Sequence, residues 1–328
     1  MSFSAFSCVA QEPNASAQHA LRSSTELVRI EASILDKNGN FVGGLGQSSF
    51  RVIDNGLEQP IEFFAPVEAP AQVLVMLETS PAVYLIHNEH LTAAYALVEG
   101  LAPDDQVALV TYDVTPKPVL SFTADKSALL AALDKVQYTL GVGDLKLYDS
   151  LSTVLDWLAL ATGKKAVVLL TTGLDSSPPG RWDALVQKLR GEDVVIFPVA
   201  LGGPLRREPG KRRKETNAEP TSQASGESSR SANPDEFAKA DAALRSLATM
   251  TGGRAYFPQS NMDFAPMYHE IAAALRHQYV LGIAPAHDNQ FHTLAVEVLG
   301  ASSQPDAART KHADYRVFAR TGYLAPAP

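Results

Sequence analysis

Gln72-Val-Leu-Val-Met-Leu-Glu-Thr-Ser80 is the stretch that decides the fold of this chain. It is a short apolar run between two prolines, a pattern typical of a fully buried strand at the centre of a parallel sheet. Ligands of open α/β sheets lie just beyond the carboxyl ends of such strands. The polar residues Glu78, Thr79 and Ser80 are therefore candidate site residues, although a strand end and a turn would explain them equally well.

Downstream of this stretch, predicted strands and helices alternate. Further strands are expected over residues 106–113, 164–173 and 194–201, with an antiparallel edge strand over 119–123 and a short strand over 254–257. Helices are expected over residues 91–101, 125–136, 148–160, 182–190, 237–251 and 262–277. This alternation predicts an α/β domain with a mostly parallel central sheet and helices on both faces.

Both ends of the chain have the pattern of β-structure instead. Short strands are expected over residues 27–35, 50–53, 61–64, 279–283, 291–299 and 315–323. Neither group is large enough to bury a core by itself. We therefore expect one β-sandwich made of residues 26–67 and 279–325, into which the α/β domain of residues 68–278 is inserted. The alternative is a linear array with two small separate sheets.

Two segments are expected to lack regular structure. Residues 203–235 are rich in charged residues, Ser and Pro, which predicts a disordered insertion. Their basic run Arg206–Lys214 could bind an acidic partner, but a solvated loop explains it more simply. Residues 1–25 are expected to be disordered or the remnant of a signal peptide, because Cys8 and Ala10 resemble a signal-peptidase site. This interpretation favours a secreted or periplasmic, cell-envelope location.

The composition argues against several classes of function. The net charge of the 328 residues is -8, which is unlike a nucleic-acid-binding protein. The single cysteine excludes an intrachain disulfide and zinc sites built on several cysteines. No stretch is apolar for long enough to form a transmembrane helix. The first strand is followed by no phosphate-binding glycine motif, and the nucleophile elbow of α/β-hydrolases is absent.

Several segments, in their order and spacing, resemble the von Willebrand factor A (VWA) domain, and specifically the bacterial VWFA-related family. The segments that carry the resemblance are Phe50–Gly56 with Gln59 and Ile61, Leu77–Ser80, Pro103–Val110, Leu147–Ser150, Val168–Gly173 with Asp175, Leu247–Gly253, Gln278–Gly282 and Arg320–Tyr323. The resemblance implies a Rossmann-like α/β domain. It also implies a non-enzymatic module that binds a protein partner.

The resemblance further implies a metal-ion-dependent adhesion site, in which Asp-x-Ser-x-Ser follows the first strand and later loops add a Thr and an Asp. Here Glu78 replaces the first Asp, and Ser80 keeps the first Ser. Ala82 and Leu145 occupy positions that need a hydroxyl, and Thr172 occupies the position of the second carboxylate. A Mg²⁺ site normally uses one or two carboxylates with waters. We therefore expect a degenerate site without a metal cofactor.

Two other interpretations stay open. A site rescued by Asp144 or Asp175 would make the chain a metal-dependent adhesion receptor that binds Mg²⁺ or Mn²⁺. A serine hydrolase would use Ser80, although nothing in the sequence places a histidine over it. His269 and His277 share the last predicted helix and have the spacing of surface residues rather than of a metal pair. The expected binding face comprises Glu78–Ser80, Val142–Lys146 and Thr172–Asp175, with Thr79, Asp144, Asp149 and Asp175 as candidate contact residues.

Overall fold

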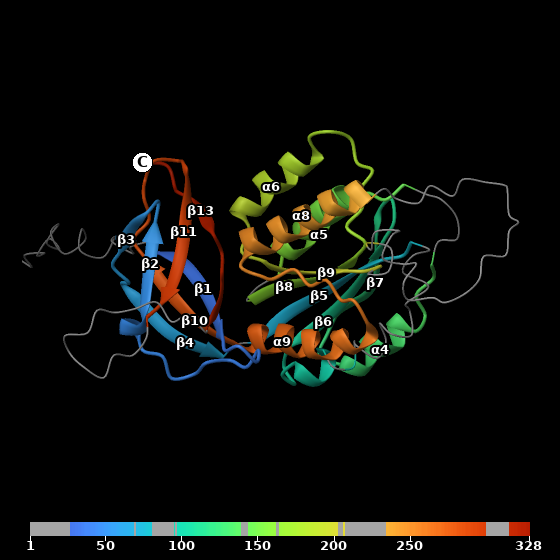
Figure 1. Ribbon diagram of the computed structural model, residues 1–328, viewed down its shortest axis with the longest axis horizontal. Helices are drawn as coiled ribbons and strands as arrows, with labels where there is room; N and C mark the ends of the chain where they lie inside the picture. Colours follow the sequence, from blue (N-terminus) through green and yellow to red (C-terminus); the bar gives the residue numbers. More distant parts are fainter. Residues whose placement is uncertain are drawn as a thin grey trace, which may run out of the picture.

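The computed structural model describes residues 27–68, 70–80, 95, 97–138, 144–161, 164–202, 206, 234–299 and 315–328. Two antiparallel sheets lie at one end of the molecule, and a third sheet covered by helices lies at the other (Figure 1). This arrangement confirms the predicted fold class. The domain limits inferred from the sequence remain predictions.

The five-stranded sheet has β5 at its centre. Its strands lie in the order β7 (Pro116–Thr123), β6 (Gln106–Tyr112), β5 (Ala71–Glu78), β8 (Lys164–Thr171) and β9 (Val195–Ala200). All neighbours pair in parallel except β7, which pairs with β6 in the antiparallel sense at the edge. Every residue of β5 except Gln72 is buried, as its continuous apolar run predicts.

Helices cover both faces of this sheet (Figure 1). One face carries α5 (Leu147–Ala159), α6 (Arg181–Gly191) and α8 (Pro234–Thr251), and the other carries α4 (Lys126–Leu133) and α9 (Phe264–Arg276). Alternate residues of β5 divide between the two cores: Leu74 and Met76 face α5, whereas Val75 and Leu77 face α9. Residues 97–100 are also helical, at the end of the helix expected over 91–101.

The two antiparallel sheets each combine strands from both ends of the chain. The first has the order β12 (Arg316–Ala319), β1 (Val28–Leu35), β10 (His277–Ile283) and β4 (Phe63–Glu68). The second has the order β13 (Gly322–Leu324), β11 (Phe291–Val298), β2 (Phe50–Asp54) and β3 (Leu57–Gln59). Ile30, Phe50, Tyr279 and Leu294 belong to one buried core between them. The linear array with separate sheets is therefore wrong.

Two segments that we predicted as single strands behave differently. The strand expected over 315–323 is split into β12 and β13, which belong to different sheets, because the chain turns at Arg320, whose Nε donates to the Gly322 carbonyl at 2.7 Å. The strand expected over 61–64 begins only at Phe63, since Pro60 and the residues after it connect β3 in one sheet to β4 in the other.

Two further boundaries differ from the sequence prediction. The strand expected over Arg254–Phe257 is reduced to one parallel bridge between Tyr256 and Val199. Helix α8 begins at Pro234, inside the segment predicted to be disordered, and proline suits the first turn of a helix because its missing N–H has no intrahelical partner there. Apart from Arg206, Pro234 and Asp235, that insertion lies outside the described residues, as do residues 1–25.

The β-sandwich and the helix-covered sheet meet at α9. Residue His277 both ends α9 and begins β10, so no linker separates the helix from the sandwich. Buried Ser33 on β1 has its hydroxyl 2.6 Å from the Ala274 carbonyl of α9. Because β5 follows β4 almost directly, the carboxyl edge of the parallel sheet lies on the side away from the sandwich (Figure 1).

Candidate functional site

Three neighbouring parallel strands end in polar side chains that lie side by side. The register pairs Glu78 with Tyr112 of β6, and it pairs Leu77 with Leu170 of β8, so Thr171 follows next to Glu78. Glu78, Tyr112 and Thr171 are each 0% exposed. A carboxylate in such surroundings requires hydrogen-bond donors to offset the cost of removing it from water.

The Glu78 carboxylate obtains these donors from its own chain. Thr171 Oγ1 lies 3.0 Å from Oε2, and the backbone N–H of Thr172 donates to the same oxygen at 2.6 Å. Thr172 Oγ1 lies 3.0 Å from Oε1 and 2.8 Å from Oε2. The Tyr112 hydroxyl lies 3.3 Å from Oε2 and 2.7 Å from Thr171 Oγ1. Hydrogen bonds to an ionised carboxylate are among the stronger ones in proteins.

Tyr112 stays protonated in this cluster. Burial, and then the nearby negative charge of Glu78, raise the pKa of Tyr112 well above its ordinary value. The phenol is therefore a permanent hydrogen-bond donor near neutral pH. The buried hydroxyl therefore helps to satisfy the Glu78 carboxylate and Thr171.

These side chains, as arranged, do not fit the divalent cation that the family resemblance implies. Oxygen Oε2 of Glu78 already accepts several hydrogen bonds, and the hydroxyls of Thr171 and Thr172 direct their protons at it. Mg²⁺ requires ligand oxygens whose lone pairs are free and arranged near an octahedron. In the part of the chain that the structure describes, no three His, Cys, Asp or Glu side chains converge in an arrangement suited to a metal ion.

Thr79 and Ser80 lie at the same edge but are not part of the carboxylate cluster. The backbone N–H and the hydroxyl of Thr79 both point at the Tyr112 carbonyl, at 3.0 and 3.1 Å, and join the end of β5 to β6. Ser80 is 9% exposed, and its Oγ has no hydrogen-bond partner among the described residues. No described histidine contacts Ser80, and Ala82 lies outside the described residues.

The three candidate aspartates have separate environments. Asp175 accepts hydrogen bonds from the Tyr148 N–H at the start of α5, at 3.1 Å, and from the Ser177 N–H, at 2.8 Å. Asp149 forms an ion pair with Arg181 at 3.2 Å. Asp144 is exposed. Asp149 and Asp175 therefore support local structure and are partly exposed, whereas Asp144 is the most exposed of the three.

The loops that carry these aspartates pack together. The Ser176 N–H donates to the Leu145 carbonyl at 2.7 Å, and the Leu145 N–H donates to the Ser176 hydroxyl at 3.0 Å. The Lys146 N–H donates to the Asp113 carbonyl after β6, at 2.9 Å. These hydrogen bonds join residues 144–146 of the predicted binding face to Ser176, directly after its segment 172–175, whereas residues 142 and 143 lie outside the described residues. The binding face itself remains a prediction.

Sequence reasoning missed three residues of this edge. Tyr112 and Thr171 could have been found by aligning the ends of the predicted parallel strands with Glu78. Arg206 could not, because it lies in a segment of disordered composition. Its guanidinium donates to the Thr172 and Leu201 carbonyls, forms an ion pair with Asp241 at 2.9 Å, and has 8% of its side chain exposed.

Residues 75–239 match the profile of the von Willebrand factor type A domain. The chain belongs to this VWA family. VWA domains are typically adhesion or protein-interaction modules and are usually not catalytic. No curated protein sequence matches the chain. No helix in the described part of this VWA protein combines the length and apolar character that a membrane crossing requires.

Solved structures resemble this VWA protein at low sequence identity. An aerotolerance-related membrane protein from Bacteroides fragilis is 14% identical, with 61% of this chain and 98% of that chain covered and a TM-score of 0.43. BatB from Bacteroides thetaiotaomicron is 16% identical, with 62% and 98% covered and a TM-score of 0.41. A von Willebrand factor type A protein from Catenulispora acidiphila is 12% identical, with 92% and 75% covered and a TM-score of 0.45. Sequence identities and TM-scores this low give no information about binding or activity.

Proposed function

We propose that this chain is a non-enzymatic protein-binding module of the bacterial cell envelope or exterior. It binds a protein partner at the carboxyl edge of its parallel sheet, over residues 144–146 and 172–177, and does so without a metal ion. In this proposal the adhesion site of the VWA family is degenerate. The secreted or periplasmic location rests on the N-terminal sequence pattern, which lies outside the described residues.

The observation that supports a metal-free edge best is the set of hydrogen-bond donors around Glu78, most of which point at Oε2. The side chain is fully buried, and its two oxygens accept hydrogen bonds from Thr171, Thr172 and Tyr112. Neutral hydrogen-bond donors, rather than a metal ion, stabilise the Glu78 carboxylate here. A protein partner then contacts the exposed loops around Asp144 and not a metal ion with a free coordination position.

The unpartnered hydroxyl of Ser80 favours the second candidate, a metal-dependent receptor that uses altered ligands. Ser80 occupies the first serine position of the adhesion motif, and its Oγ is buried without a hydrogen-bond partner in the part of the chain that the structure describes. A cation bound there would satisfy it. The same observation argues against the serine hydrolase, since a nucleophilic hydroxyl needs a general base within hydrogen-bond distance.

Capture of envelope proteins by the immobilised chain tests the proposed function. We expect a specific partner to be retained in EDTA as well as in Mg²⁺. Reversal of the exposed charge in Asp144→Lys should abolish that retention. The matched control is Glu62→Lys, a charge reversal at an exposed position of the sandwich.

Each outcome of this capture experiment decides one point. Retention that requires Mg²⁺ would reject the metal-free proposal and favour the receptor with altered ligands. Loss of the partner in both charge reversals, or in neither, would reject the carboxyl edge as the binding face. Circular dichroism of the three proteins shows whether they fold alike.

A further inference from the structure

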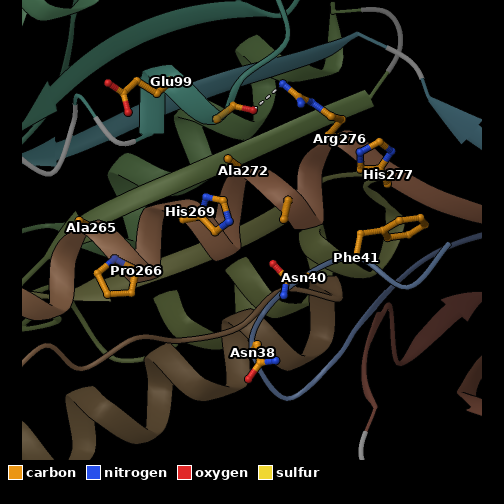
Figure 2. Close-up of a pocket in the computed structure, with 12 residues that line it drawn as sticks. Asn38, Asn40, Phe41, Glu99, Ala265, Pro266, His269, Ala272, Arg276 and His277 are labelled. Atoms are coloured by element: carbon orange, nitrogen blue, oxygen red, sulfur yellow. Dashed lines mark hydrogen bonds between the residues drawn. The ribbon is translucent and has the colours of Figure 1, made fainter.

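A groove of about 690 Å³ lies where α9 runs into the β-sandwich, on the side of the molecule away from the carboxyl edge. Helix α9 forms its floor, residues 99–100 form one wall, and residues 38–41 form the other (Figure 2). Pockets that bind small molecules or short peptide segments commonly have volumes between about 300 and 1,000 Å³ and often lie between domains.

The floor of the groove is apolar and closely packed. A Cβ placed on Gly100 would lie 2.2 Å from the Cβ of Ala272, so the two helices touch at two small residues. This close approach brings the Gly100 carbonyl over α9, where Arg276 reaches it. One end of the groove is lined by aromatic rings, since Phe41 and His277 stack with 4.8 Å between their centroids (Figure 2).

Arg276 indicates the chemical class of ligand that the groove binds. Its Nη2 donates to the Gly100 carbonyl at 2.8 Å, and its Nε is buried without a partner. In the described chain it forms no ion pair. By contrast, Arg254 and Arg316, which also contact α9, both pair with Glu270, at 2.8 and 3.1 Å. A guanidinium that lines the groove and whose charge meets only a neutral carbonyl is a site for a carboxylate.

The other groups around the groove limit the charge of the ligand. Glu99 lies on the same wall as the Gly100 carbonyl, at the end away from Phe41 and His277 (Figure 2). Its carboxylate would repel a second negative charge. The exposed side chains of Asn38, Asn40 and His269 can donate hydrogen bonds to neutral polar groups of a ligand.

We propose that this groove binds a monocarboxylate with an apolar body. The carboxylate pairs with Arg276, and the apolar body lies along Ala273 and against the Phe41 ring. Such a ligand is either a free organic acid or the C-terminal residue of a peptide, because both present the same chemistry. The site is independent of the proposed protein-binding edge, so its failure would leave that proposal unchanged.

Isothermal titration of the full chain with N-acetylphenylalanine, and with its uncharged amide, tests the site. The two probes differ only in the charge that Arg276 would recognise. We expect the acid to bind at least tenfold more tightly than the amide, since hydrogen bonds to charged groups are stronger than those between neutral groups. Equal binding of the two probes, or no binding of the acid at about 10 mM, would overturn the proposal.

A pair of variants links this binding to one residue. Arg276→Gln keeps a donor for the Gly100 carbonyl but removes the charge, and it should weaken binding of the acid about tenfold or more. Arg254→Gln, an arginine that does not line the groove, should bind the acid as the wild type does. Unchanged binding in Arg276→Gln would overturn the assignment. Should Arg276→Gln not fold, the comparison of acid and amide in the wild type still decides.

A third probe distinguishes the two sources of the ligand. A short peptide that ends in phenylalanine with a free carboxylate is compared with N-acetylphenylalanine. Tighter binding of the peptide indicates that the groove takes a protein C-terminus. Equal or weaker binding indicates a free organic acid. In both cases, binding of the probe must weaken in Arg276→Gln.

Discussion

At the scale of single residues, Glu78 shows how one buried carboxylate can be satisfied within the protein. Its oxygens face two threonines and a tyrosine on neighbouring strands, and the backbone N–H of Thr172 completes the set. The sequence predicted the position of Glu78 and Thr172 at the sheet edge. It did not predict that the two side chains would bind each other, because that depends on the strand register.

Removal of the carboxylate should therefore be costly. We expect Glu78→Ala to lower the free energy of unfolding by about 2–4 kcal/mol, since it leaves several buried donors unpaired and opens a small cavity. Urea denaturation measures this change. Asp144→Ala, at an exposed position, should stay within about 0.5 kcal/mol of the wild type. A loss below about 1 kcal/mol in Glu78→Ala would show that the cluster does not stabilise the fold.

His292 in the β-sandwich makes the free energy of unfolding depend on pH. Its Nε2 lies 3.0 Å from Asp288 and its Nδ1 lies 2.7 Å from Asp54. The hydrogen bonds to Asp288 and Asp54 raise the pKa of His292 above its ordinary value of 6.5. The hydrogen bond with His292 in turn contributes most to lowering the pKa of Asp288 below 3.8. Protonated His292 thus bridges two carboxylates.

The sign of the pH effect follows from these directions. The raised pKa of His292 gives stability that is complete below pH 6.5, its unfolded value, and that is lost as the pH rises through the higher folded pKa. The lowered pKa of Asp288 gives stability that is lost only as the pH falls below 3.8. Urea denaturation between pH 5 and 9 should show the alkaline loss, and His292→Gln should remove it. An unchanged slope in His292→Gln would contradict this assignment.

At the scale of elements, most of the fold could be predicted because each strand and helix has its own periodicity. The apolar run of β5 and the alternating pattern of β1 required no tertiary information. The division of residues 315–323 between two sheets could not be predicted. The two strands have a similar sequence character, and only their pairing differs: β12 pairs with β1, and β13 pairs with β11. Arg206 was missed for the opposite reason: its composition indicated disorder, whereas its guanidinium binds the ends of two strands.

Helix α5 shows that two similar aspartates can contribute unequally. Asp175 accepts hydrogen bonds from the first turn of α5 and from Ser177. Asp149 has only an exposed ion pair with Arg181. We expect Asp175→Ala to lower the free energy of unfolding by about 1–2 kcal/mol, as the loss of a helix cap does, and Asp149→Ala by less than about 1 kcal/mol. Equal effects in thermal denaturation would contradict the capping role of Asp175.

At the scale of the whole molecule, the sandwich and the VWA sheet share a core. Leu35 of β1 and Phe318 of β12 are buried in the same cluster as Ile271 of α9 and Val75 of β5. Glu270 of α9 also pairs with Arg316 of β12. The discontinuous sandwich therefore serves as a rigid base for the sheet whose far edge carries the candidate binding face.

This shared core predicts that the two parts unfold together. Differential scanning calorimetry of the full chain should show one transition whose calorimetric and van't Hoff enthalpies agree. Separate domains would unfold independently and give two transitions. A second transition that moves when Phe318→Ala is introduced, while the first stays in place, would contradict the shared core.

We propose that internal hydrogen bonds to Glu78 take the place of the metal ion of the VWA adhesion site. Thermal denaturation of EDTA-treated protein, titrated with Mg²⁺ and then with Mn²⁺, tests it most directly, because a ligand that binds only the folded state raises the melting temperature. We expect no change in melting temperature up to millimolar concentrations of either ion. A saturable rise that disappears in Ser80→Ala would contradict it.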